Sequence, residues 1–169
     1  MPEQLSVNMA FQQREWVWQR LGWALMVLIT VAALLGLLGG PGPLNTAEWG
    51  EPSQGFWAEG RHVERHHRPA QLTVHVDPRL AQGGALFLTI DRDYLHHMQA
   101  TTITPMPTET RIVGPNLELR FALAPLNPDL RTITLFFEPD HIGRSHATFV
   151  VRGETGEPRQ VHINQLVLP

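Results

Sequence analysis

The 169-residue sequence predicts an all-β domain, an immunoglobulin-like β-sandwich, preceded by a single N-terminal transmembrane α-helix. Two observations carry this prediction. An uncharged apolar run extends from Leu21 to Leu38, and the chain from residue 61 onward contains several short stretches in which apolar and polar residues alternate. The first pattern is typical of a membrane span, and the second is typical of half-buried antiparallel strands.

The apolar run is long enough to cross a bilayer. Only Gly22, Thr30 and Gly36 interrupt it, and at about 1.5 Å per residue it forms a helix roughly 27 Å long. A helix that is apolar on every side has no polar face for water, which excludes a surface position in a soluble fold. The run is also longer than the roughly 7–15 residues of a signal-peptide core, so we expect a permanent anchor rather than a cleaved signal.

The charges on either side of the run predict its orientation. Arg14 and Arg20 precede it, and no Lys or Arg follows it until Arg61. Because basic residues accumulate on the cytoplasmic side of a span, we expect a cytoplasmic N-terminus and a C-terminal domain across the membrane.

The chain is expected to divide into four parts. Residues 1–20 form a cytoplasmic tail and the start of the anchor helix, which begins near Ala10, and residues 21–39 form the transmembrane helix. Residues 40–60 are rich in Gly, Pro and acidic residues, which is typical of a linker. Residues 61–169 form the β-sandwich.

Alternation defines the expected strands of that domain. The clearest stretches are 72–76, 86–90, 117–123, 133–137 and 147–151. Turn residues separate them, and this spacing favours a sandwich, with a small barrel as the alternative. In the last stretch, the apolar parity changes between Ile163 and Leu166, which predicts a bulge near Asn164. Residues 91–99 lack alternation and begin with a cap-like Asp91, so a single helical turn is expected there.

Composition excludes several functions. The chain has no cysteine, which excludes disulfides, thiolate metal sites and a cysteine nucleophile. It carries 13 basic residues, all arginine, against 16 acidic ones. The sequence has no run of basic residues that would indicate nucleic-acid binding. No nucleophile elbow, phosphate-binding loop or zinc-protease motif occurs. We therefore expect no enzyme activity, no cofactor and no small-molecule substrate.

The nine histidines are the candidates for a metal site. The candidate ligands fall in two clusters, His62, His66 and His67 in the first and His96 and His97 in the second. Adjacent histidines on a strand point to opposite faces and cannot clamp one ion. A solvated basic surface is therefore expected, with a periplasmic metal-handling accessory protein as the alternative function.

Three large aromatic residues, Trp49, Phe56 and Trp57, lie in the expected linker. Aromatic side chains are enriched at interface hot spots and also at membrane surfaces. Three interpretations stay open for them: contact with a protein partner, contact with the lipid interface, and packing on the chain's own sandwich.

The sequence as a whole resembles an uncharacterised family of small proteobacterial single-pass membrane proteins. The stretches that carry the resemblance are "FQQREWVWQRLGW", "GGPGPL" after the apolar run, "ITPMPTE" and the closing "INQLVLP". The resemblance implies a short cytoplasmic tail, one anchor in the bacterial inner membrane and a periplasmic β domain. It brings no catalytic residue. The expected function is a non-enzymatic interaction or assembly module that docks on an integral membrane protein.

The orientation can be tested with reporter fusions. A reporter enzyme that is active only in the periplasm should be active when fused after Pro169, because Arg14 and Arg20 hold the N-terminus in the cytoplasm. A reporter that is active only in the cytosol should be silent at the same position. The reverse pattern would contradict the orientation.

Overall fold

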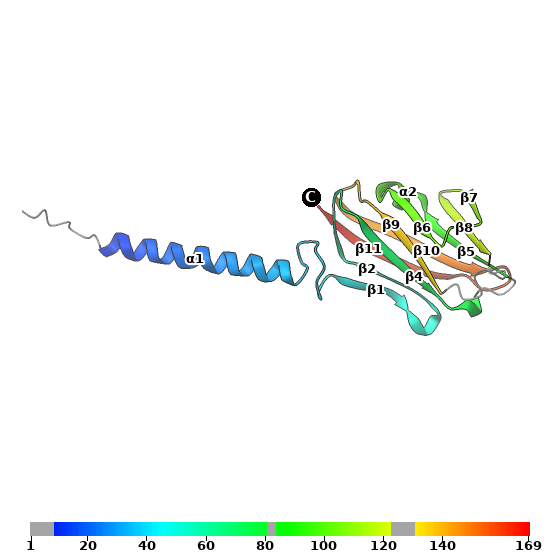
Figure 1. Ribbon diagram of the computed structural model, residues 1–169, viewed down its shortest axis with the longest axis horizontal. Helices are drawn as coiled ribbons and strands as arrows, with labels where there is room; N and C mark the ends of the chain where they lie inside the picture. The colour runs from blue at the N-terminus through cyan, green and yellow to red at the C-terminus, as the bar shows by residue number, and fades with distance from the viewer. Residues whose placement is uncertain (1–8, 81–83, 123–130) are drawn as a thin grey trace, which may run out of the picture.

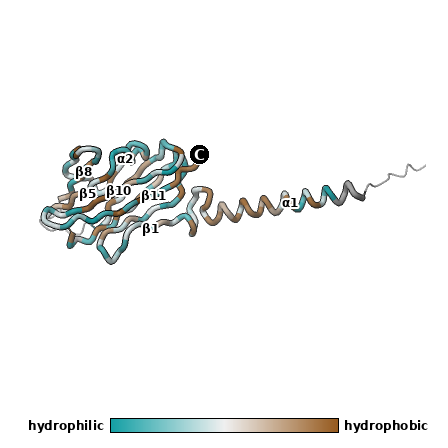
Figure 2. The backbone as a smooth tube through the Cα atoms, turned by 180° about the vertical axis from the view of Figure 1, so that it is seen from behind, coloured by the Kyte–Doolittle hydropathy of each residue, from teal (hydrophilic) through white to brown (hydrophobic). Residues whose placement is uncertain are grey.

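One long helix projects from the end of two packed β-sheets in the computed structural model, which describes residues 9–80, 84–122 and 131–169 (Figure 1). The helix, α1 (Met9–Leu34), begins one residue before the expected Ala10. Its segment Arg14–Leu34 is long and apolar enough to cross a membrane. The most apolar part of this segment is not buried against any other described part of the chain. Figure 2 shows apolar residues over the half of α1 next to the sheets. It is not a core helix of the domain.

The expected helix end at residue 39 is wrong by five residues, because α1 ends at Leu34. Gly36 adopts the left-handed conformation with a φ of 86°. The N–H of Gly36 donates to the carbonyl of Ala33, and that of Leu37 donates to Ala32, which caps the last turn. The glycine therefore terminates the helix.

The two sheets have five and six strands, in the orders β1-β2-β4-β9-β6 and β3-β11-β10-β5-β8-β7. All neighbours are antiparallel except β3 and β11, which are parallel. The strands are β1 (Thr46–Glu51), β2 (Phe56–Arg61), β3 (Val63–Arg65), β4 (Ala70–Val76), β5 (Ala85–Asp91), β6 (Ala100–Thr104), β7 (Glu109–Val113), β8 (Asn116–Ala122), β9 (Thr132–Phe137), β10 (Gly143–Gly153) and β11 (Arg159–Leu168). Two separate sheets around one apolar core make an immunoglobulin-like sandwich rather than a small barrel.

The alternating stretches form strands as expected, namely β4, β5, β8, β9 and β10. Their apolar positions are buried between the sheets; examples are Leu72, Val74, Leu88, Ile90 and Phe149. Leu123, at the end of the third expected stretch, lies outside the described residues. The expected helical turn is α2 (Arg92–His97), and the side chain of Asp91 accepts from the N–H of Asp93 at its start. Two short 3-10 turns, η1 (Pro52–Gln54) and η2 (Pro78–Leu80), complete the elements.

The predicted linker over residues 40–60 is wrong, because this segment supplies β1, η1 and β2. Ala47 and Trp49 of β1 are buried, as are Phe56 and Ala58 of β2. These inward positions alternate with more exposed ones, and the hairpin pairs with β4 as part of the five-stranded sheet. The domain therefore begins near Thr46 rather than at residue 61.

The predicted bulge near Asn164 is also wrong. β11 pairs with β10 in unbroken register from Arg159 to Val167. The inward position after Ile163 is taken by the polar Gln165, which is buried, whereas Leu166 faces outward. The apolar parity of the sequence changes because one inward residue is polar, not because the strand bends.

The register of β8 can be tested by comparing two neighbouring residues. Phe121 is buried, whereas Arg120 is half-buried and pairs with Glu109 across 3.5 Å. Phe121→Ala should lower the free energy of unfolding by about 3–5 kcal/mol and Arg120→Ala by less than about 1 kcal/mol. Denaturant unfolding would measure both. Equal effects would show that the register is wrong.

Candidate functional site

Residues 35–45, which we call the joint, connect α1 to the sandwich through a buried asparagine. The side-chain amide of Asn45 donates to the carbonyls of Gly40 and Val63 at 2.9 and 2.8 Å. Its oxygen accepts from the N–H of Val63 at 2.7 Å. The two bonds to Val63 fix the joint to β3, and the bond to Gly40 closes the joint on itself. The joint is thus folded against the domain.

A second set of contacts closes the joint. Nε of Arg65 donates to the carbonyl of Leu38 at 2.7 Å, and the N–H of Leu44 donates to the carbonyl of Leu35. A Cβ on Gly42 would lie 2.5 Å from the backbone nitrogen of Gly36, so only glycine fits there. The end of α1 and β3 are therefore held against each other.

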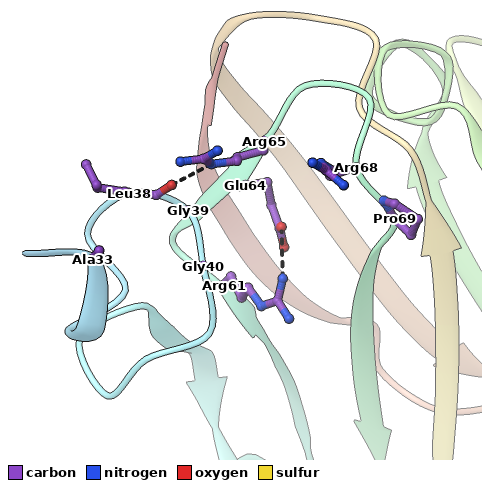
Figure 3. Close-up of a pocket in the computed structure, with 9 residues that line it drawn as sticks. All are labelled: Ala33, Leu38, Gly39, Gly40, Arg61, Glu64, Arg65, Arg68 and Pro69. Carbon is purple, nitrogen blue, oxygen red and sulfur yellow. Dashed lines mark hydrogen bonds and ion pairs between the residues drawn. The ribbon is translucent and has the colours of Figure 1, made fainter. Parts of the chain in front are cut away.

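Between the joint and the sandwich lies a pocket of about 400 Å³ (Figure 3). It is lined by Ala33 of α1, by Leu38, Gly39 and Gly40 of the joint, and by Arg61, Glu64, Arg65, Arg68 and Pro69. In Figure 3 the Glu64 carboxylate faces the Arg61 guanidinium, and the Arg65 guanidinium points toward the joint. The pocket therefore combines three arginines and one glutamate at the helix-proximal end of the domain.

Glu64 is the unusual member of this set, because its side chain is only 2% exposed. Its Oε2 lies 3.6 Å from Nη1 of Arg61, and its Oε1 has no hydrogen-bond partner. Burial raises the pKa of Glu64 to about 7, although the Arg61 charge acts in the opposite direction. A buried carboxyl group that is half-protonated near neutral pH and has one unpaired oxygen is typical of a functional position.

A chain of buried hydrogen bonds lies beside Glu64 and joins three elements. The hydroxyl of Tyr94 in α2 donates to Oε1 of Gln165 in β11 at 2.7 Å. Nε2 of Gln165 donates to the backbone carbonyl of Arg61 at 3.1 Å. Burial, together with the charge on Glu64, raises the pKa of Tyr94. The tyrosine is therefore held as a neutral hydrogen-bond donor.

The structure separates the three expected interaction residues. Trp49 and Phe56 are 8% and 2% exposed and pack in the core. For these two residues, packing on the chain's own sandwich is the correct interpretation, and contact with a partner or with lipid is wrong. Trp57 is half-buried and its ring stacks on His75, with centroids 4.6 Å apart. It lies opposite Gly50, near the end of β1 that is farther from the helix. Replacing Trp49 would therefore disturb the fold itself.

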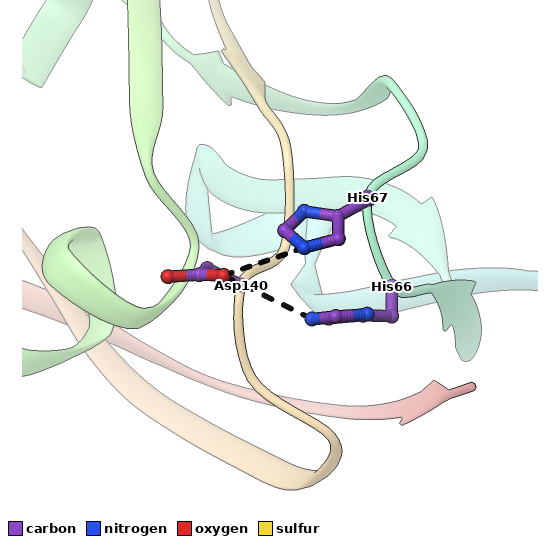
Figure 4. Close-up of side chains that lie close together, drawn as sticks. All are labelled: His66, His67 and Asp140. Carbon is purple, nitrogen blue, oxygen red and sulfur yellow. Dashed lines mark ion pairs between the residues drawn. The ribbon is translucent and has the colours of Figure 1, made fainter.

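The structure also divides the candidate metal ligands. His66 and His67 lie together with Asp140, with ligand atoms within 4.8 Å of one another (Figure 4). His62 instead packs its ring edge against Trp49, with centroids 5.9 Å apart. His96 and His97 are exposed at the end of α2. The sequence does not predict Asp140 as a ligand. It lies close to the histidines because β9, which precedes it, pairs with β4, which follows them.

Comparisons with known proteins give no family assignment. No protein-family model matches the sequence, and no curated protein matches it. Among solved structures, the soluble domain of PmoD from Methylocystis sp. ATCC 49242 (Rockwell) is 12% identical, with a TM-score of 0.36, over 73% of this chain and 90% of that one. ACE19, the collagen-binding subdomain of the Enterococcus faecalis surface protein ACE, is 6% identical, with a TM-score of 0.33, over 68% and 97%. These likenesses carry no inference about a ligand. The apolar helix and the β domain fit a membrane-anchored protein.

The raised pKa of Glu64 predicts how stability depends on pH. The folded domain binds this proton up to about pH 7, whereas the unfolded chain releases it near the ordinary pKa of 4.5. The contribution of Glu64 to stability is therefore greatest below about pH 4.5 and falls as the pH rises to about 7, by on the order of 3 kcal/mol. Glu64→Gln keeps the shape and removes the charge, so the variant should be more stable than the wild type above pH 7.

The difference in unfolding free energy between the variant and the wild type, measured by denaturant unfolding across this range, checks the prediction. The exposed Glu157 provides the control, because Glu157→Gln should leave the slope unchanged. A wild-type slope that persists in Glu64→Gln would assign the pH dependence to other groups.

Proposed function

We propose that the protein is a non-enzymatic interaction module, anchored in the bacterial inner membrane with its β domain in the periplasm, which docks on an integral membrane protein. The observation that carries this proposal is the arginine-lined pocket between the joint and β3. Because Ala33 of α1 is part of its lining, the pocket lies beside the end of the candidate membrane span.

The joint supports docking close to the bilayer. Its hydrogen bonds from Asn45 and Arg65 hold the sandwich against the end of α1. Leu37, Leu38 and Leu44 of the joint remain 48%, 37% and 56% exposed. Large exposed apolar side chains beside a charged pocket are suited to an interface with a membrane-embedded protein.

The charge of the pocket indicates the chemistry of the partner. Arg61, Arg65 and Arg68 outnumber the single Glu64, which is itself half-protonated near pH 7. An arginine guanidinium binds a carboxylate through two parallel hydrogen bonds. The partner is therefore expected to present an acidic side chain near the membrane surface.

Docking through this pocket can be tested by reversing its charge. A photo-crosslinking amino acid at Pro69 of the full-length protein should capture one integral membrane protein in native membranes. In the same chain, the combined substitutions Arg65→Glu and Arg68→Glu should reduce that crosslink at least tenfold, because like charges would then face each other.

Arg111 provides the matched control, since it is an exposed arginine of β7, at the opposite edge of the six-stranded sheet from β3. Arg111→Glu should leave the crosslink from Pro69 unchanged. An acidic residue of the captured protein, changed to lysine, should restore crosslinking to the charge-reversed variant. Crosslinks to lipid alone, or the same products with a crosslinker placed at Arg111, would refute docking at the pocket.

A further inference from the structure

We infer that His66, His67 and Asp140 form a binding site for a divalent transition-metal ion such as Zn²⁺ or Cu²⁺. Nε2 of His66 lies 3.8 Å from Oδ1 of Asp140, and Nε2 of His67 lies 3.7 Å from the same oxygen. The two imidazole rings are 3.8 Å apart at their centroids (Figure 4). Three ligand atoms of the kinds that such ions prefer thus converge on one point.

The backbone positions both histidines for this role. They are not on a strand, where neighbouring side chains diverge, but in a turn closed by a bond from the Arg68 N–H to the Arg65 carbonyl. His67 has a φ of 52°, in the left-handed region that side chains disfavour. The N–H of His66 donates to Leu168, and the N–H of His67 donates to Pro139. A disfavoured conformation held by the surrounding chain is typical of a functional site.

The carboxylate is positioned just as firmly. The N–H of Asp140 donates to the carbonyl of His97 at 3.0 Å. Nε2 of Gln99 donates to Oδ2 of Asp140 at 2.9 Å, which leaves Oδ1 facing the histidines. Oε1 of Glu138 lies 3.7 Å from Nδ1 of His67, so the opposite ring nitrogen is the one presented to the metal. Outer groups that orient the ligands in this way are characteristic of metal sites.

The distances between the ligand atoms suit an ion of intermediate hardness such as Zn²⁺. Ligand atoms about 2.0–2.2 Å from a tetrahedral Zn²⁺ are roughly 3.3–3.5 Å apart, so small side-chain rotations from the present 3.7 and 3.8 Å suffice. Two imidazole nitrogens exclude a preference for Mg²⁺ or Ca²⁺, which take oxygen ligands. The side chains of His67 and Asp140 are 58% and 48% exposed. The remaining coordination positions therefore face solvent, and the ion is exchangeable.

Zinc titration of the full-length protein in detergent micelles tests this site. After treatment with a chelator, the wild type should bind one equivalent of Zn²⁺ by calorimetry, and Co²⁺ should give the visible absorption of a site with nitrogen ligands. His66→Ala combined with His67→Ala should abolish both signals, and so should Asp140→Asn. In Gln99→Asn, the asparagine tolerates the left-handed backbone of residue 99, but its side chain is too short to reach Asp140. It should weaken binding by about 10–100-fold.

His146 is the matched control, because it is an exposed histidine that bonds to Asn164 on the outer face of β10 and β11. His146→Ala should bind Zn²⁺ like the wild type. Circular dichroism would establish that each variant is folded. A wild type that binds no Zn²⁺, or stoichiometric binding that survives in both the double histidine variant and Asp140→Asn, would overturn the inference. Neither result depends on the docking partner, so the two proposals fail separately.

Discussion

The attachment of the joint to β3 through Asn45 is the constraint on which the rest of the helix-proximal structure depends. One buried side chain satisfies the N–H and the carbonyl of Val63 and a carbonyl of the joint. Without it, those backbone groups would be buried and unpaired, which costs about 1–3 kcal/mol for each group. Among the described strands, the short β3 pairs only with β11, in parallel, so few other strand contacts hold it. Asn45 therefore fixes the start of the segment that carries both the pocket and the histidine turn.

The polar groups beneath the pocket show why this end of the sandwich differs from an ordinary core. Inward positions elsewhere hold apolar residues, but Gln165 and Glu64 are buried here. Gln165 has its partners in Tyr94 and the Arg61 carbonyl, so its burial adds specificity at little cost. Glu64 lacks a partner for one oxygen, and its burial is unfavourable when it is charged. A fold under selection for stability alone would not keep it, and this cost supports the proposal that the pocket takes part in binding.

The sequence predicts the anchor and the central strands well, because both depend on local patterns that a single physical rule explains. The missed elements share a different cause. The segment from β1 to β2 contains Gly50, Pro52 and Gly55, and its strands fill two inward positions with alanine. Their alternation is therefore hidden in a composition typical of linkers. The histidine site escapes prediction for another reason. It requires Asp140, which the pairing of β9 with β4 brings to the histidines, and a left-handed His67, and neither is encoded in the spacing of the histidines.

The fold also places arginines near the end of the candidate membrane span that are distant from it along the chain. Counted along the chain, Arg61 is far from the helix, but the joint brings Arg61, Arg65 and Arg68 to its end. Basic residues in a folded domain oppose export less than those in a short loop, because domains cross the membrane largely regardless of charge. Arg14 and Arg20 therefore still favour the proposed cytoplasmic N-terminus. The arginines of the pocket belong to the folded domain and lie at the end of the helix. Arg65 is next to the proposed metal ligand His66. A bound divalent ion would add positive charge there and strengthen the attraction of an acidic partner.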